Sequence, residues 1–290
     1  MKKKRLFSLL LAGALTMSLA ACGGQEGVTN NASENSSASG EETGTQASAE
    51  TQTEEASVKP ETPSGQLIFG FITDLEGEFY DTAFNNTATN YKAYNLIHGY
   101  ETVTYTKEDE FVYNPTVVKS HEEVENEDGT KTYTVTINDG LTWNDGTPIT
   151  AKDYVFQMLL ESSPEMNQVD GYPCLSGIYY VGYEEYLAGE TEYFQGVRLV
   201  DDMTYSLTVK AEELPFHYDI TYALSTPRPL SVIAPGCDIV DSEEGAYISG
   251  DFTTELLQET INNPDTGYRY NPQVTCGPYK FVSYDTASRQ

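Results

Sequence analysis

The side chains of this 290-residue chain that could bind a metal are few and widely separated. No two cysteines stand in a CxxC pair, so the sequence contains no zinc framework. The histidines lack the close spacing of helical metal ligands, and we predict no metal site and no cofactor. In an exported protein two of the cysteines could form a disulfide, and their spacing does not show which two. These residues are His98, His121, His217, Cys174, Cys237 and Cys276.

Carboxylates are the other group that could do chemistry, because the chain carries 45 Asp and Glu residues. A pair of them could serve a secreted glycosidase as acid and base. So many acids make chance pairs common, however, and none stands in a recognisable motif. The sequence also lacks GxSxG, HExxH, GxGxxG and P-loop motifs. We therefore predict that the protein is not an enzyme.

The first residues have the pattern of an export signal. A basic run, Lys2 to Arg5, precedes an apolar stretch, Leu6 to Leu19, that is too short for a comfortable membrane span. The following Leu-Ala-Ala-Cys-Gly is similar to the lipobox of bacterial lipoproteins. This similarity implies that residues 1–21 are a lipoprotein signal peptide and that a lipid on Cys22 anchors the protein to the extracytoplasmic face of the cell membrane. Ordinary export cleavage, with the cysteine incidental, is the alternative.

Residues 22–65 differ sharply in composition from the rest of the chain. They are rich in Ser, Thr, Ala, Gly, Glu and Gln and contain no aromatic residue. Such a segment buries too little apolar surface to offset its conformational entropy. We predict a disordered acidic tether that holds a folded module away from the lipid headgroups.

The charge balance restricts the partners of the protein. The formal net charge is −29, and four of the 16 basic residues stand at positions 2–5. Nucleic-acid binding needs a basic surface, which this composition does not offer. An acidic chain is also repelled by anionic lipid, so membrane contact should depend on the lipid at Cys22 alone.

The segment 131–156 has the clearest local signals. Alternation from Lys131 to Ile137 predicts a half-buried strand, and two Asn-Asp-Gly turns follow it. Thr150 and Asp153 then predict a capping box, with the acid at the positive end of a helix dipole. Trp143, between the turns, is predicted to be a core residue rather than a stacking surface for a ligand.

Strand and helix patterns are mixed along the remainder of the chain. This mixture without strict alternation indicates an α/β or α+β fold. The predicted elements are hairpins at 117–137 and 196–209, helices at 91–99 and 253–261, strands at 67–72 and 279–283, and a proline-rich connector at 226–235.

Several of these segments, in this order, resemble the solute-binding proteins of ABC importers, in the oligopeptide, dipeptide and nickel-binding branch. Members of the family usually have the motif Gly-Thr-Gly-Pro-Tyr, whereas this chain has Thr275-Cys276 before Gly277-Pro278-Tyr279. The specific parts are DGTKTYTVTI (128–137), NDGLTWNDGTPITAKDYVF (138–156), residues 185–197, VDDMTYSL (200–207), Pro235 and GPYKF (277–281).

The resemblance implies an α/β fold of the type II periplasmic-binding kind, in which two lobes close on a ligand by hinge motion. Family members are much longer than this chain. Residues 66–290 are therefore predicted to be only the N-terminal lobe, a mixed sheet with helices and a hairpin-rich subdomain at about 111–229. On this prediction the chain is truncated and its second lobe is missing, and a naturally short protein is the alternative.

The resemblance also indicates which residues contact the ligand. They are Asn85, Asn86 and Thr87 after the first predicted strand, and Tyr172 after the helix that Asp153 caps. Loops at strand ends are where open α/β sheets bind ligands. For Asn85 and Thr87 the alternative is turn and cap chemistry, and for Tyr172 it is packing.

The sequence thus predicts a lipid-anchored protein that captures oligopeptide-like solutes and delivers them to an ABC permease. The alternative is a surface sensor or adhesion lipoprotein on the same fold, without transport. Peptides, nickel complexes and sugars are all bound on this scaffold, so the ligand stays open.

Overall fold

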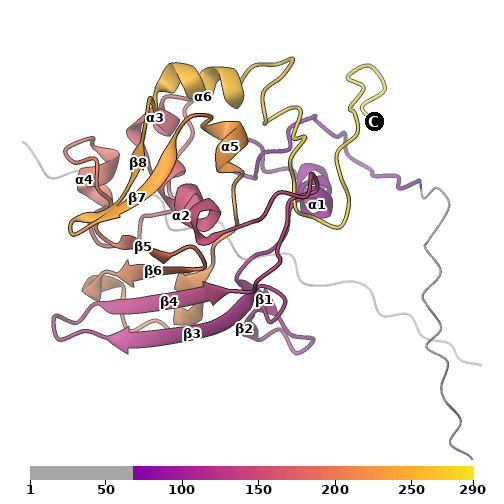
Figure 1. Ribbon diagram of the computed structural model, residues 1–290. Coiled ribbons are helices and arrows are strands. Elements are labelled where there is room, and N and C mark those ends of the chain that lie inside the picture. Colours follow the sequence, from indigo (N-terminus) through magenta and orange to yellow (C-terminus); the bar gives the residue numbers. More distant parts are fainter. Residues whose placement is uncertain (1–67) are drawn as a thin grey trace, which may run out of the picture. The chain divides into compact units, whose positions relative to one another are not determined.

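The computed structural model describes residues 68–290. They belong to the second of two units, Met1–Gly65 and Gln66–Gln290. The predicted signal peptide, Cys22 and the tether lie outside the described residues, and so they stay predictions. Residues 68–290 contain three antiparallel sheets and several short helices (Figure 1).

The strands and helices alternate irregularly along the chain, as the mixed pattern predicted. The strands are β1 (Val103–Tyr105), β2 (Phe111–Tyr113), β3 (Val118–Glu125), β4 (Lys131–Ile137), β5 (Val197–Asp201), β6 (Thr204–Val209), β7 (Asp238–Ser242) and β8 (Gly245–Ser249). The α-helices are α1 (Ala88–Ile97), α2 (Ala151–Leu160), α3 (Pro164–Asn167), α4 (Tyr183–Leu187), α5 (Leu230–Ile233) and α6 (Thr254–Thr260), with 3₁₀ helices η1 (Ala211–Glu213) and η2 (Asp219–Ala223).

The largest sheet has the strand order β3-β4-β6-β5, which confirms both predicted hairpins. In β4 every second side chain is buried, from Tyr133 to Ile137, and Tyr133 stands opposite Glu123 on β3 and Leu207 on β6. Strand β3 forms one edge, and its residues after Val118 are exposed. The period-2 pattern therefore reports one buried face, as expected for an antiparallel sheet.

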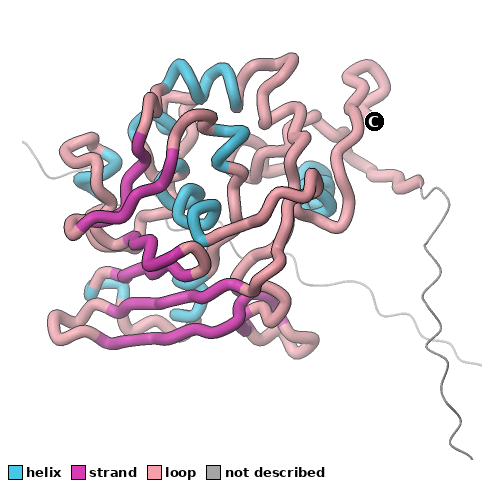
Figure 2. The backbone as a smooth tube through the Cα atoms, in the orientation of Figure 1, coloured by secondary structure: helices cyan, strands magenta, loops and turns pink. Residues whose placement is uncertain are grey.

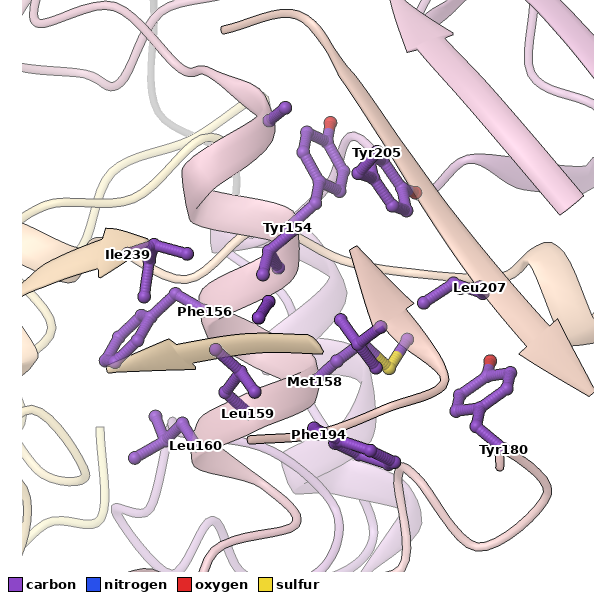
Figure 3. Close-up of a cluster of buried hydrophobic side chains, with 14 of the residues drawn as sticks. Tyr154, Phe156, Met158, Leu159, Leu160, Tyr180, Phe194, Tyr205, Leu207 and Ile239 are labelled. Atoms are coloured by element: carbon purple, nitrogen blue, oxygen red, sulfur yellow. The ribbon is translucent and has the colours of Figure 1, made fainter. Parts of the chain in front are cut away.

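Helix α2 lies between the four-stranded sheet and the β7–β8 hairpin (Figures 1 and 2). Tyr154 stacks on Tyr205 of β6, with ring centroids 5.6 Å apart, whereas Phe156 lies on the side of Ile239 in β7 (Figure 3). Every residue of the helix except Lys152 is buried. An apolar surface on all sides is typical of a helix in the middle of a core.

The two Asn-Asp-Gly turns and the capping box also form as predicted. Gly140 and Gly146 both have φ of 87°, which favours glycine. The Asp153 carboxylate accepts a hydrogen bond from the Thr150 N–H at 2.9 Å. Trp143 is 4% exposed, so its predicted place in the core is confirmed.

The segment around Gly277 docks onto the end of α1. The Gly277 N–H donates to the Ile97 carbonyl at 2.8 Å, and the Tyr279 N–H donates to the Leu96 carbonyl at 2.9 Å. A Cβ at Gly277 would lie 2.4 Å from the Ile97 carbonyl carbon, so a side chain does not fit there. Just before it, the Asn144 N–H of the second turn donates to the Thr275 carbonyl at 2.8 Å.

Two predicted strands are wrong. Residues 68–72 form no strand, and Ile68, Phe69 and Ile72 are exposed. Residues 279–283 form none either, and Val282 is exposed. Both runs have the composition of a strand, but a buried strand also needs neighbouring strands, and no strand within residues 68–290 pairs with either run.

The helix predicted at 91–99 begins earlier, at Ala88, and the predicted helix at 253–261 is α6. The connector at 226–235 contains the short helix α5. Cys174, Cys237 and Cys276 are free thiols. Among the described residues there is no helix with the length and apolar character needed to span a membrane.

Candidate functional site

A buried arginine joins three distant parts of the chain. Arg228, between η2 and α5, is 3% exposed. Its Nε donates to Glu161 Oε1 at 2.7 Å, and its Nη2 lies 3.4 Å from Asp81 Oδ2. Its Nη1 donates to the Tyr80 carbonyl at 3.1 Å, and the guanidinium lies 4.4 Å from the centroid of the Tyr80 ring. The planar fork of arginine suits this set of partners and holds residues 80–81 against the end of α2.

Glu161, directly after α2, has hydrogen bonds to both carboxylate oxygens. Oε1 also accepts from the Tyr80 hydroxyl at 3.3 Å, and Oε2 accepts from Gln157 Nε2 at 2.5 Å and Ser176 Oγ at 2.8 Å. Ser225 Oγ in turn donates to Gln157 Oε1 at 3.1 Å. A buried charge with its acceptor sites filled is far less costly than an unpaired one, so these hydrogen bonds offset much of the cost of burying Glu161.

The cluster contains two carboxyl groups, those of Glu161 and Asp81, but one guanidinium, that of Arg228. Burial raises the pKa of Asp81, the charge of Glu161 raises it further, and Arg228 opposes both. The Tyr172 hydroxyl donates to Asp81 Oδ2 and favours its charged form. Nearby, burial and then Arg228 lower the pKa of His98 to about 3, so this imidazole is neutral at physiological pH.

An open pocket of about 810 Å³ lies against this cluster. Gln157, Glu161 and Arg228 line it with buried polar groups, and Thr82 contributes from the loop before α1. A volume of this size is typical of sites for small organic ligands. The cluster therefore supplies a fixed, polar wall for a pocket that is open to solvent.

Aromatic side chains form the other part of the lining. The Tyr179 and Tyr222 ring centroids lie 5.2 Å apart, and those of Phe216 and Tyr222 lie 5.5 Å apart. Tyr179 and Phe216 are each 44% exposed, although both are large aromatic residues. Large exposed rings beside a polar cavity are typical of a binding surface.

The structure gives Asn85 and Thr87 local roles at the start of α1. Asn85 Oδ1 accepts from the Thr87 N–H at 3.2 Å, and its Nδ2 donates to Glu76. Thr87 is the N-cap residue, and its Oγ1 accepts from the Asn90 N–H at 3.3 Å. Asn86 is exposed. These bonds are the turn and cap chemistry that the sequence left as the alternative, and ligand contact by Asn85, Asn86 and Thr87 stays a prediction.

Tyr172 is a buried member of the cluster. It is 3% exposed, and its ring packs against Tyr80 and Phe84 at centroid distances of 6.0 and 4.9 Å. Its hydroxyl donates to Asp81, which is paired with Arg228. Tyr172 does not line the pocket, and a direct contact with ligand stays a prediction.

The sequence reasoning missed Arg228, Glu161 and the aromatic residues of the pocket. Two signals were present. Arg228 stands between two prolines in an apolar stretch, and Glu161 directly follows the apolar run of α2. A charge in such surroundings needs a buried partner, but the sequence does not show which one.

No group of three or more His, Cys, Asp or Glu side chains within residues 68–290 is arranged to hold a metal ion. The residues that line the pocket offer hydrogen-bonding groups, aromatic faces and carboxylates.

The sequence of residues 112–289 matches the family described as bacterial extracellular solute-binding proteins, family 5. The chain belongs to this family. Membership agrees with the fold class predicted from the sequence, the mixed α/β type II periplasmic-binding fold. A comparison with curated proteins gives no match.

Among solved structures the chain is similar to oligopeptide-binding proteins. OppA of Listeria monocytogenes, bound to peptide, has 16% identity and a TM-score of 0.49 over 74% of this chain and 35% of that one. Lactococcal OppA, complexed with an endogenous peptide, has 18% identity and a TM-score of 0.48 over 72% and 35%. Burkholderia pseudomallei OppA has 19% identity and a TM-score of 0.46 over 71% and 33%. The chain spans about a third of the length of these structures.

Proposed function

We propose that this protein captures oligopeptide-like solutes outside the cytoplasm and delivers them to an ABC importer. The match of residues 112–289 to the extracellular solute-binding family carries this proposal. The solved structures that the chain resembles include two that hold peptides. On this proposal the chain supplies part of the binding surface and the transporter supplies the energy for uptake.

The pocket gives geometric support to the proposal, and nearly all of it lies in the part of the chain that matches the family. Of its lining residues, Thr82 alone lies before the matched range 112–289. The pocket combines a polar wall with exposed aromatic rings, and this combination suits a ligand with both polar and apolar parts. A ligand that binds only the folded state is expected to stabilise the folded protein, and at a given concentration a tighter ligand stabilises it more.

Native mass spectrometry of the full-length protein, purified without denaturation, tests the proposal. We expect a bound peptide, or a mass shift after addition of a peptide mixture. Uptake of those peptides should fall in a strain that lacks the gene. A protein that neither carries nor accepts any small solute would contradict the proposal. Binding without any loss of uptake would instead favour a sensor or adhesion protein.

We further propose that a lipid on Cys22 anchors the protein to the membrane. The Leu-Ala-Ala-Cys sequence after a basic and apolar start supports this assignment. The Cys22→Ser variant should lose metabolic labelling by a fatty acid and leave the membrane fraction for the soluble one. Cys237→Ser, which changes a partly exposed thiol in the folded unit, is the matched control and should stay with the membrane. A Cys22→Ser protein that remains lipid-labelled would refute the anchor.

A further inference from the structure

The charged side chains that line the 810 Å³ pocket are three carboxylates and one guanidinium, those of Glu161, Glu212, Glu213 and Arg228. The guanidinium already has hydrogen-bond and ion-pair partners within the protein. Its Nε, Nη1 and Nη2 contact Glu161, the Tyr80 carbonyl and Asp81. It therefore has little capacity to attract a negative group of a ligand, although it is the one basic residue of the lining.

The two other carboxylates are available. Glu212 and Glu213 form the second and third residues of η1, one exposed and the other half-buried. Within residues 68–290 neither side chain has a hydrogen bond or an ion pair. The nearest basic residue in sequence, Lys210, does not compensate them. Its Nζ donates to Glu184 at 2.6 Å and to the Ile178 carbonyl at 2.9 Å.

Aromatic rings line the same pocket beside these carboxylates. Tyr179 and Phe216 each contact Tyr222, and the hydroxyl of Tyr222 donates to the Glu213 carbonyl at 3.1 Å, which fixes η1 beside the rings. The face of an aromatic ring is electron-rich and attracts a cation, above all an ammonium or a guanidinium. The carboxylates of Glu212 and Glu213 also attract a cation, so they act in the same direction as the rings.

We propose that this pocket selects a cationic group on an extended apolar stem. The rings would cover the stem, and Glu212 and Glu213 would face the charge. The inference rests on the proposed function and names its ligand class: solutes with alkylammonium or alkylguanidinium groups. Lysine- or arginine-containing peptides and free polyamines share this chemistry. An acidic side chain or a terminal carboxylate is disfavoured here, because the carboxylates of the lining outnumber its one paired arginine.

Isothermal titration calorimetry of the full-length protein separates the charge from the rest of the ligand. The probes are three pentapeptides that differ only in the central residue of an alanine background: lysine, norleucine and glutamate. Norleucine keeps the apolar stem of lysine and removes the ammonium. Spermidine is the fourth probe and represents the polyamines. We expect the lysine peptide to bind about tenfold more tightly than the norleucine peptide, and the glutamate peptide to bind most weakly.

Two variants locate the preference. Glu212→Gln with Glu213→Gln removes the rim charge without changing the shape of the side chains, and it should reduce the preference for lysine over norleucine to about threefold or less. Phe216→Leu keeps an apolar surface without the ring and should weaken the lysine peptide more than the norleucine peptide. Glu127→Gln, an exposed acid on the β3–β4 turn, is the matched control and should leave the preference unchanged.

Each outcome has a distinct meaning. Equal affinity for all three peptides would overturn the cation preference and leave the proposed function intact. A lysine preference that survives the double glutamine variant would overturn the assignment to this pocket. Tight binding of spermidine with weak binding of every peptide would support the cation site and identify polyamines as the solute. Binding of none of the four probes would overturn this inference together with the proposed capture of peptides.

Discussion

Arg228 stands 67 residues from Glu161 and 147 residues from Asp81 in the sequence, and it contacts both. A guanidinium with several buried partners can fix the geometry of a site more rigidly than apolar packing. The charges nevertheless do not stabilise the fold simply because they are paired, since removing them from water is costly. What the cluster adds is one defined arrangement of the residues behind the pocket.

Replacement of Arg228 by methionine should be severely destabilising. Glu161 and Asp81 would remain buried without a counter-charge, and the expected loss is about 3–5 kcal/mol in the free energy of unfolding. Urea denaturation followed by circular dichroism measures it. Lys119→Met is the control, because the Lys119–Asp139 pair is exposed and should contribute at most about 1 kcal/mol. Equal losses in the two variants would show that the buried cluster has no special role in stability.

Asp153 should make stability depend on pH. Burial raises its pKa to about 6 in the folded protein, against hydrogen bonds from Thr150 that lower it, whereas 3.8 is the value for an unperturbed carboxyl. The folded state therefore binds this proton more tightly than the unfolded state does. The stabilisation is complete below about pH 4 and is lost as pH rises through about 6, by roughly 2–3 kcal/mol.

The Asp153→Asn variant tests this pH dependence. Asparagine keeps an acceptor for the Thr150 N–H and does not titrate. The free energy of unfolding, measured in urea between pH 4.5 and 7, should fall less steeply with rising pH in the variant than in the natural protein. Asp139→Asn, at an exposed acid, should leave the slope unchanged. Parallel curves for Asp153→Asn and the natural protein would show that the carboxyl is not buried as described.

At the scale of elements, the sequence predicted what local chemistry determines. The alternation in β4, the turns at Gly140 and Gly146 and the capping box at Thr150 each depend on residues a few positions apart. All of them form. The sequence did not predict that α2 is buried on nearly all sides, because this depends on the β7–β8 hairpin about 80 residues later in the chain.

The two strands predicted wrongly show the limit of composition. Residues 68–72 and 279–283 are apolar and aromatic enough for a strand, but a strand forms only where a neighbour supplies hydrogen bonds. Composition shows that a segment is able to form a strand, but the strand forms only if another strand pairs with it. The described residues contain no partner strand for either segment.

The segment around Gly277 packs closely against the end of α1, so a side chain at this position should weaken the contact. Gly277→Ala would place a Cβ 2.4 Å from the Ile97 carbonyl carbon, so the segment or the helix end must shift. We expect a loss of about 1–3 kcal/mol in the free energy of unfolding, measured by urea denaturation. Gly70→Ala is the control, because nothing lies within 4 Å of a Cβ there, and it should change stability by at most about 0.5 kcal/mol. A neutral Gly277→Ala change would mean that this segment does not dock on α1.

At the scale of the whole molecule, the sequence identified the family and missed the site. Family resemblance depends on motifs, and these motifs are turns, strands and caps. The pocket is lined from several separate segments, among them Thr82, residues 157–161, residues 175–180 and residues 212–228. Pocket residues so far apart come together only through the fold, so no local pattern indicates them.

Hydrogen–deuterium exchange of the full-length protein, with and without a saturating peptide, shows directly whether the proposed pocket binds solute. This pocket is formed by η1, the segment before α5 and the end of α2. We expect slower exchange on binding at residues 175–180 and 211–226, with little change in the β3–β4 hairpin. Protection confined to other segments, with these residues unchanged, would show that solute does not bind at this pocket.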